Sequence, residues 1–420
     1  MTEPDYTPWV DRIDALAATA EHELIRLAEI NSGSNNLPGL RALADVLAQQ
    51  FEPLGGTLTR SELGCTRRIN DSGEEEPWEH GPLLSIRKWP EAPLQVLLVG
   101  HMDTVFPVDH PFQSVRALPQ GRLHGPGVAD LKGGLMVMLN ALSVLEGSPW
   151  AGRLGWEVLL NPDEEIGSPG SAPFLAAAAG RNHLGLVFEP SMPDGTLAGA
   201  RKGSGNFVAV FRGRAAHAGR EHHLGRNAIR AMADFTSGLD DLNGQRPGVT
   251  VNPGFVAGGG PVNVVPDRAL LRFNVRIDQV EHEEWILGEL KRLSSDITGR
   301  DGFELVFHGG FGRKPKPMTG DTQRLFELVA DTGKRLGMDL AWAPTGGCCD
   351  GNNLAAAGLP NVDTLGVVGG NIHSDREYME LDSLISRGRL SALLLMRLAS
   401  DQTAWPGLPG SSAEGRGNGR

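Results

Sequence analysis

The sequence predicts an α/β protein whose sheet-and-helix domain is interrupted by a second, inserted domain of the ferredoxin-like α+β class. Two observations lead to this prediction. Short apolar runs that end in turn residues alternate with helical patterns in the first two-fifths of the chain and in about its last hundred residues, which is typical of an α/β domain. The stretch between them, residues 197–312, predicts elements in the order β-α-β-β-α-β, which is that of a ferredoxin-like sandwich.

The predicted strands of the outer domain are short and apolar. Leu94–Val99 (LQVLLV) has the pattern of a buried strand, and the same pattern predicts strands over Leu154–Leu160, Leu184–Phe188 and Val362–Val368. Between them, one helical face is traced by Leu135, Met138, Leu139, Leu142 and Leu145. We expect this domain to comprise residues 1–196 and 313–400.

Six elements account for the predicted insertion. Strands are expected over Asn206–Phe211, Thr250–Val256, Ala269–Ile277 and Phe303–Phe307, with helices over Arg226–Leu242 and from Ile286 to Leu293. In the third of these strands the apolar residues alternate with Arg272, Asn274 and Arg276, so those three side chains face the opposite side.

Two segments are expected to lie outside regular structure. The acidic stretch Asp71–Glu79 is predicted to be a surface loop. Residues 401–420 lack an apolar pattern and are predicted to form a disordered tail.

Composition and charge exclude several classes of partner. The 420 residues include 51 Asp and Glu against 39 Lys and Arg, a formal net charge of -12. Non-specific binding to nucleic acid or to an anionic membrane needs clustered basic residues, so neither partner is expected. No stretch approaches the roughly 20 apolar residues of a transmembrane helix, and the N-terminal 30 residues follow the pattern of an amphipathic helix and not of a signal peptide.

The cysteines indicate a reducing compartment. There are three, Cys65, Cys348 and Cys349. An odd number with two adjacent does not look like a disulfide framework. A cytoplasmic location is therefore the expectation.

Residues that commonly bind metals follow the four predicted strands of the outer domain. They are His101 and Asp103 after the first, Glu164 and Glu165 after the second, Glu189 after the third and His373 after the fourth, with Asp130 before a helix. Each has an ordinary structural explanation, such as a helix N-cap or a solvated turn. Carboxylates and imidazoles are zinc ligands, and functional groups of α/β sheets gather where strands end, so their coincidence favours a metal site.

His101 and Asp103 form the most specific of these pairs. Two residues apart on an extended chain, their side chains point to the same face. His101 can then bind a metal while Asp103 holds the other imidazole nitrogen.

Five motifs, GHMDTVFP, GPGVADLKGG, NPDEEIGSPGS, FEPS and HSDREY, occur in this order. With them, the chain from about Leu24 to Leu398 resembles the co-catalytic zinc peptidase and deacylase family that includes carboxypeptidase G, acetylornithine deacetylase, succinyl-diaminopimelate desuccinylase and aminoacylase. The resemblance implies a zinc-peptidase-like catalytic domain with a central mixed sheet flanked by helices. It further implies that the insertion is a lid and dimerisation domain, and that the protein is a homodimer.

The same resemblance implies a role for each candidate residue. Asp130 would bridge two zinc ions, with His101 and Glu189 completing one site and Glu165 and His373 the other. Glu164 would be the general base on a water between the metals, and Asp103 would orient His101. Cobalt and manganese accept the same ligands, so zinc itself rests on the resemblance.

Within the insertion, the resemblance points to residues that bind substrate. His217 in AAHAG matches a histidine that reaches the active site of the partner subunit. Asn263 and Arg276 match residues that hold the substrate's carboxylate or carbonyl, and Arg276 suits a bidentate carboxylate contact. Arg313 is a weaker candidate for the same role.

One loop departs from the family pattern. In Thr345–Asn352 (TGGCCDGN), cysteine stands where many relatives have a hydroxyl residue, which bears on specificity and on sensitivity to oxidation. A cysteine nucleophile is a further alternative, but it would need a neighbouring base to form the thiolate.

Three functional hypotheses remain open. The leading one is a glutamate carboxypeptidase-like enzyme that releases a C-terminal amino acid from a small N-acyl or peptidyl substrate, because GLPNVDTLGVVGGNIHSDREY matches the carboxypeptidase G branch in detail. The alternative is an N-acyl-amino-acid deacylase, and the third is a metal- or ligand-binding protein that has lost catalysis. The presence of Glu164 beside a full set of ligands argues against the third.

Overall fold

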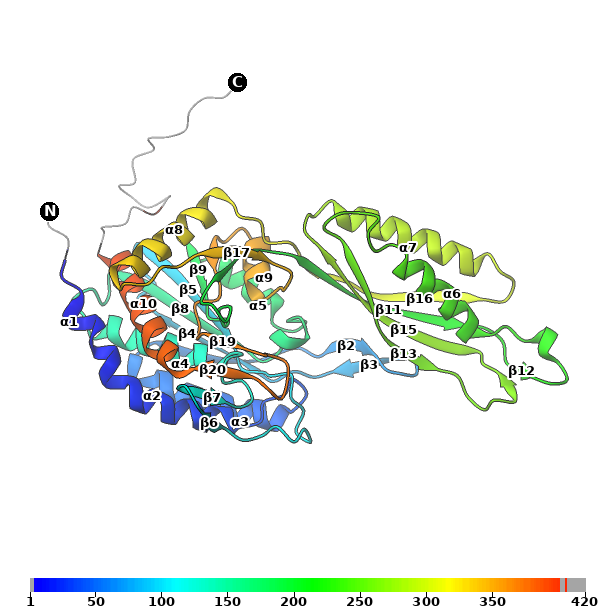
Figure 1. Cartoon of the computed structure of the whole chain (residues 1–420), viewed down its shortest axis with the longest axis horizontal. Helices are drawn as coiled ribbons and strands as arrows, with labels where there is room; N and C mark the ends of the chain where they lie inside the picture. The colour runs from blue at the N-terminus through cyan, green and yellow to red at the C-terminus, as the bar shows by residue number, and fades with distance from the viewer. Residues whose placement is uncertain (1–3, 401–404, 406–420) are drawn as a thin grey trace, which may run out of the picture.

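The computed structural model describes residues 4–400 and Trp405, which form a larger and a smaller unit side by side (Figure 1). The larger unit contains a six-stranded sheet and the smaller a four-stranded sheet. The predicted tail, 401–420, lies outside the described residues except for Trp405. Across the described residues, no helix combines the length and the apolar character needed to span a membrane.

The six-stranded sheet is mixed, as expected. In spatial order its strands are β1 (Thr57–Glu62), β4 (Pro82–Lys88), β8 (Leu154–Asn161), β5 (Leu94–His101), β9 (Leu184–Val187) and β18 (Asn361–Val362). The strands β1, β4 and β8 are antiparallel neighbours, whereas β8, β5, β9 and β18 run parallel. Three of the four predicted strands are confirmed as β5, β8 and β9.

The fourth predicted strand, Val362–Val368, is wrong for most of its length. Only Asn361–Val362 pairs in the sheet, as β18. Its apolar side chains are buried, as the sequence pattern required, but Thr364 adopts a φ of 63°, which interrupts an extended chain. The apolar residues of Val362–Val368 therefore predicted burial correctly, but they did not predict the backbone conformation.

Helices cover both faces of this sheet. One face carries α1 (Thr7–Val10), α2 (Arg12–Ala28), α3 (Leu37–Phe51), α4 (Lys132–Glu146), α8 (Gly320–Arg335) and α10 (Leu381–Ala399), and the other α5 (Ala172–Ala179) and α9 (Asp350–Ala356). Along β5 the side chains alternate between the two cores, Val96 and Leu98 joining the first and Leu97 and Val99 the second. Three short 3-10 helices are η1 (Glu52–Leu54), η2 (Glu164–Ile166) and η3 (His222–Leu224).

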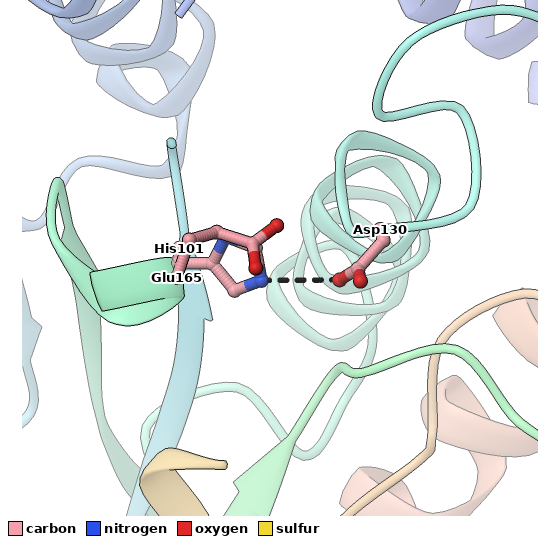
Figure 2. A group of neighbouring side chains, drawn as sticks. All are labelled: His101, Asp130 and Glu165. Carbon is pink, nitrogen blue, oxygen red and sulfur yellow. Dashed lines mark hydrogen bonds and ion pairs between the residues drawn. The ribbon is translucent and has the colours of Figure 1, made fainter. Parts of the chain in front are cut away.

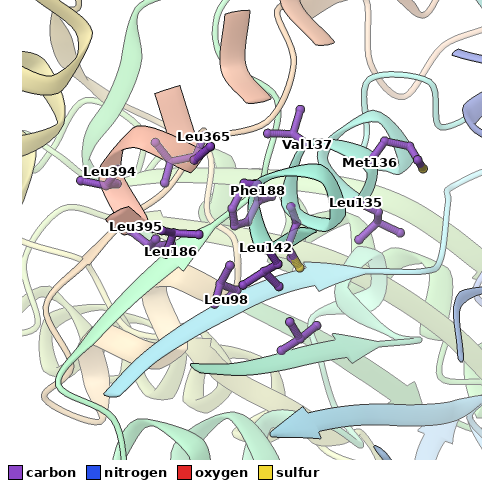
Figure 3. Packing of buried hydrophobic residues seen from close by; sticks show 14 of the residues in the cluster. Leu98, Leu135, Met136, Val137, Leu142, Leu186, Phe188, Leu365, Leu394 and Leu395 are labelled. Carbon is purple, nitrogen blue, oxygen red and sulfur yellow. The ribbon is translucent and has the colours of Figure 1, made fainter. Parts of the chain in front are cut away.

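The helix α4 packs unusually close to the sheet. Figure 3 shows Leu142 of this helix beside Leu98 of β5 and Leu395 of α10. At Gly134 a Cβ atom would lie 2.0 Å from the backbone oxygen of Phe188, so only glycine permits this approach. The contact joins the start of α4 to the segment that follows β9.

The smaller unit, here called the inserted domain, is the predicted ferredoxin-like sandwich. Its antiparallel strands, in spatial order, are β13 (Thr250–Gly258), β15 (Arg268–Ile277), β11 (Gly203–Arg212) and β16 (Glu304–Arg313). The helices α6 (Ala228–Asp240) and α7 (His282–Thr298) cover one face around a separate apolar core. The predicted boundaries at 196/197 and 312/313 remain a prediction, because a two-stranded sheet of β10 (Leu197–Arg201) and β17 (Trp342–Thr345) lies at the junction.

Three smaller sheets complete the structure. They consist of β2 (Thr66–Ile69) with β3 (Glu75–Trp78), of β12 (Ala216–His217) with β14 (Val264–Val265), and of β19 (Gly369–Gly370), β20 (Tyr378–Glu380), β7 (Arg122–His124) and β6 (Arg116–Leu118). The acidic stretch predicted to be a loop is therefore partly strand, since it contains β3. Glu75 and Glu76 are held across the hairpin by Arg67 and Arg68, at 3.2 and 2.7 Å, which offsets their repulsion.

The close approach of α4 generates a paired prediction. Gly134→Ala should destabilise the fold by about 1–3 kcal/mol, the usual effect of overpacking, because the helix must move away from the backbone at Phe188. Gly288→Ala, in the exposed part of α7 where a Cβ would meet nothing within 4 Å, should stabilise the fold by about 0.5–1 kcal/mol. Chemical denaturation of both variants measures the difference, and equal effects would contradict the packing argument.

Candidate metal centre

The five predicted ligands come together at one edge of the six-stranded sheet. His101 is the last residue of β5, Glu165 lies in η2 directly after β8, and Glu189 follows β9. Because these three strands are parallel neighbours, their carboxyl ends lie at the same edge. Asp130 precedes α4, and His373 lies in the turn between β19 and β20.

Asp130 lies between two histidines and offers one oxygen to each. Its Oδ1 is 3.2 Å from Nε2 of His101, and its Oδ2 is 3.2 Å from Nε2 of His373. Figure 2 shows the first of these contacts, with Glu165 beside the imidazole. This is the arrangement expected of a carboxylate that bridges two cations.

Each histidine has a second carboxylate of its own. Nε2 of His101 is 3.8 Å from Oε2 of Glu189, and Nε2 of His373 is 3.1 Å from Oε2 of Glu165. The structure therefore contains two histidine–carboxylate pairs that share Asp130. Ligand atoms of His101, Asp130 and Glu165 all lie within 4.8 Å of one another.

The electrostatics of the cluster indicate a place for cations. Burial, reinforced by the charge of Asp130, raises the pKa of Glu165 to about 7, and burial also raises the pKa of Glu189. Hydrogen bonds to Asp130 and Glu165 raise the pKa of His373 to about 11. A cluster of carboxylates and imidazoles suits zinc, cobalt or manganese, because each of these metals takes carboxylate oxygens and imidazole nitrogens as ligands.

Asp103 supports the cluster in two ways. Nδ1 of His101 donates a hydrogen bond to the backbone carbonyl of Asp103 at 2.9 Å, while the nearest carboxylate oxygen lies at 3.4 Å. The carboxylate accepts hydrogen bonds from the backbone N–H groups of Glu164 and Glu165, both at 3.1 Å, and from Ser34. Asp103 thus holds the turn that carries Glu164 and Glu165, besides its contact with the imidazole of His101.

Glu377 is a supporting residue that sequence reasoning missed. Its carboxylate accepts backbone hydrogen bonds from Gly127, Ala129 and Asp130, at 2.9–3.1 Å. Burial raises its pKa to about 7. The residue stands in the motif HSDREY, but only the pairing of β20 with β7 brings it to the Asp130 loop, and local sequence carries no signal of that pairing.

Glu164 faces an arginine from the inserted domain. Nη2 of Arg313 lies 2.8 Å from Oε1 of Glu164 and also donates to the backbone carbonyl of Glu164 and to Ser168, both at 2.9 Å. Burial raises the pKa of Glu164 well above its usual range, and the Arg313 guanidinium opposes this shift. That Arg313 binds the substrate's carboxylate stays a prediction, since the contacts found are with Glu164 and its neighbours.

The cluster opens into a cavity of about 350 Å³ whose wall includes Cys348. Nη1 of Arg276 donates to Sγ of Cys348 at 2.8 Å, and Nη1 of Arg313 lies 3.8 Å from it. Burial raises the pKa of this thiol, but the two guanidinium groups lower it by more, so the net shift is downward. Arg276 thus contacts a residue of the cavity wall, and that it binds the substrate's carboxylate stays a prediction. The neighbouring Cys349 is buried and caps the start of α9.

His217 and Asn263 are not brought to the cluster within this chain. His217 belongs to β12, which pairs with β14, and the backbone carbonyl of Asn263 accepts a hydrogen bond from Ala218. Both residues are exposed. Figure 1 shows β12 at the end of the inserted domain that lies farthest from the larger unit.

Comparison with known proteins agrees with this geometry. The model of Peptidase family M20/M25/M40 matches residues 97–397. Carboxypeptidase G2 of Pseudomonas sp. (strain RS-16) is 26% identical over 406 residues, which cover 93% of each chain. Succinyl-diaminopimelate desuccinylase of Azoarcus sp. (strain BH72) is 27% identical over 377 residues, 85% of this chain and 92% of the relative. A dinuclear metal-binding peptidase of the M20 family from Bacillus subtilis has the same fold, with a TM-score of 0.63, 15% identity, and coverage of 92% of this chain and 99% of its own.

Proposed function

The chain belongs to peptidase family M20/M25/M40, and on this premise we propose that it is a two-zinc carboxypeptidase that releases a C-terminal amino acid from an acylated or peptidyl substrate. One observation carries the proposal: the two oxygens of Asp130 face separate histidine–carboxylate pairs. The similarity to carboxypeptidase G2 supports the choice of substrate class.

His101, Asp130, Glu165, Glu189 and His373 would hold the two cations. Paired cations of this kind activate a water molecule and polarise a carbonyl group. Glu164 then takes the proton from the attacking water on its carboxylate and delivers it to the nitrogen of the leaving amine. Asp103 keeps that carboxylate in place through the backbone of the same turn.

On the substrate side, Arg276 would bind the free carboxylate of the amino acid that leaves. It lies on β15 and reaches the cavity wall at Cys348. A charge-assisted contact suits this task, because the planar guanidinium matches a carboxylate with two parallel hydrogen bonds. Arg313, in contact with Glu164, would keep the base oriented toward the cavity.

An N-acyl-amino-acid deacylase is the second candidate. It is supported by the similarity to a desuccinylase. Both reactions hydrolyse an amide beside an amino acid, so the same ligands and base serve either one. The two activities would differ in the acyl group that the substrate carries on the amino acid.

The position of His217 supports a further part of the proposal, that the protein is a homodimer. The side chain lies exposed at the far end of the inserted domain, where it cannot serve its own metal cluster. A second copy of the chain could accept it, together with Asn263, at its own cavity. In that assembly each active site would contain residues of two subunits.

The free carboxylate of the substrate provides the first test of the function. Amidation of the C-terminus of a good substrate should lower kcat/KM at least tenfold, because hydrogen bonds to charged groups contribute about 1.5–3 kcal/mol. Arg276→Ala should lower kcat/KM for the acid to a similar extent and leave the amide almost unchanged. Equal rates of the parent enzyme on acid and amide would rule out the carboxypeptidase assignment.

The two adjacent glutamates should give different phenotypes. Glu164→Gln keeps the shape of the side chain but cannot accept a proton, so kcat should fall by at least a hundredfold, within the usual range of 10²–10⁴ for general base catalysis. Its zinc content should match the parent. Glu165→Gln should instead weaken zinc binding, and added zinc should partly restore activity. Reversed phenotypes would mean that ligand and base have been interchanged.

Mixed dimers test whether His217 acts across a subunit interface. His217→Ala and Asp130→Ala should each be nearly inactive alone. After subunit exchange, their mixture should recover roughly a quarter of the parent activity, because a mixed dimer contains one complete site. Activity assays after exchange, monitored by native mass spectrometry, give the answer. No recovery in a mixture with demonstrated exchange would contradict the interface role.

A further inference from the structure

The hairpin of β2 and β3, residues 66–78, connects the larger unit to the inserted domain at a point away from their covalent connections. It leaves the six-stranded sheet between β1 and β4 and runs toward β13 and β15 (Figure 1). Ile69, in the hairpin, is 8% exposed and packs with Val210 and Leu270 of the inserted domain. At Gly73, in the turn, a Cβ atom would lie only 2.8 Å from Cγ1 of Val210.

The opposing surface is a row of arginines along β15. Arg268, Arg272 and Arg276 are four residues apart, so all three side chains leave the same face of the strand. The residues that alternate with them point into the core beneath α6 and α7. The arginine face is therefore the face turned away from those helices.

The first two arginines of the row hold the hairpin. Nη1 of Arg268 donates to the backbone carbonyl of Ser72 at 2.7 Å. Nη2 of Arg272 donates to the backbone carbonyl of Ile69 at 2.9 Å, and its Nη1 lies 2.7 Å from Oδ1 of Asp71. Each guanidinium thus donates a hydrogen bond to the backbone of the hairpin. Substitution of the hairpin's side chains alone would leave these hydrogen bonds in place.

The third arginine of the row contacts Cys348, which lines the cavity beside the metal cluster. Arg272 and Arg276 are four residues apart, or about 13 Å at the usual rise of a strand. The strand between them is central in its sheet, paired along its length with β11 and β13. A shift of β15 at the hairpin is therefore transmitted to Arg276.

The covalent connections between the two units do not by themselves prevent the inserted domain from rotating relative to the larger unit. They run side by side, since the backbones of Arg201 and Lys316 exchange hydrogen bonds of 2.9 Å in both directions. Two adjacent connections act as one hinge, about which the inserted domain can turn. A third attachment at the hairpin, away from that hinge, opposes this turning.

We propose that the β2–β3 hairpin is an interdomain strap, and that Arg272 is the positioning residue through which it sets Arg276 at the active-site cavity. The substrate role of Arg276 rests on the proposed function, whereas the strap itself does not. The attachment is local: a cleft of about 880 Å³ remains between the hairpin and the sheet, lined by residues that include Arg67 and His308. Few contacts therefore hold the strap, and a small number of changes should release it.

A shortened hairpin provides the main test. Thr66 and Trp78 are register partners at the base, so replacing residues 67–77 by Asn-Gly closes the ladder with a favoured two-residue turn and removes the tip. Fluorophores on non-natural amino acids at the exposed positions Glu91 and Glu284 report the distance between the units by single-molecule energy transfer. The shortened protein should show a broader distance distribution than the parent, with unchanged secondary structure by circular dichroism.

Point variants distinguish loss of the strap's attachment from a general loss of structure. Because Arg272 also lies over the ring of Phe255, Arg272→Ala is compared with Arg272→Lys, which keeps a donor for the hairpin carbonyl and should partly restore the narrow distribution. Arg67→Ala is the matched control, since its ion pair with Glu75 lies within the hairpin. That variant should keep the narrow distribution of the parent.

The catalytic readout is the preference for a free carboxylate. In the shortened protein and in Arg272→Ala, the ratio of kcat/KM for acid over amide should fall at least fivefold, mainly through KM for the acid, while Arg67→Ala keeps the parent ratio. An unchanged distance distribution in the shortened protein would overturn the strap. A broadened distribution with an unchanged ratio would overturn the positioning of Arg276. If the parent hydrolyses no substrate of either kind, the proposed function fails, and the distance measurement alone still decides whether the hairpin restrains the two units.

Discussion

The position of the Asp130 carboxylate is the constraint on which the rest of the site depends. Its two oxygens must face His101 and His373, which arrive from distant parts of the chain. Glu377 fixes the backbone at Asp130 by accepting three N–H groups, and the tight packing at Gly134 fixes the helix that follows. Displacement of either support would separate the two halves of the cluster, because Asp130 is the one carboxylate that both share.

A second constraint joins Glu164 to the inserted domain. Arg313 ends β16 and contacts the carboxylate, the backbone carbonyl and a neighbouring serine of the turn that carries Glu164. Arg276, from β15 of the same sheet, contacts Cys348 in the wall of the cavity. The inserted domain therefore contributes directly to the surroundings of Glu164 and Cys348, which both line the cavity.

The sequence was sufficient for the elements that local pattern determines. Strands such as β5 and β15 follow from runs and alternation, and the places of His101, Glu165 and Glu189 after predicted strands bring them to one edge of the sheet. It was insufficient where long-range contacts decide: most of Val362–Val368 is buried without being a strand, and Glu75 belongs to β3, where it forms an ion pair with Arg67 across the hairpin. Glu377 escaped notice for the same reason, since its partners lie about 250 residues earlier in the chain.

The discontinuity of the larger unit has a consequence for how the chain matures. Helix α10 packs against α2 and α4, and Arg389 of α10 pairs with Asp14 of α2, so the first core needs both ends of the chain. The inserted domain, by contrast, has its four-stranded sheet and both covering helices in one continuous stretch, with a core of its own. During synthesis the inserted domain can therefore fold before α10 is available to α2 and α4, which leaves apolar surface of the larger unit exposed until α10 has been made.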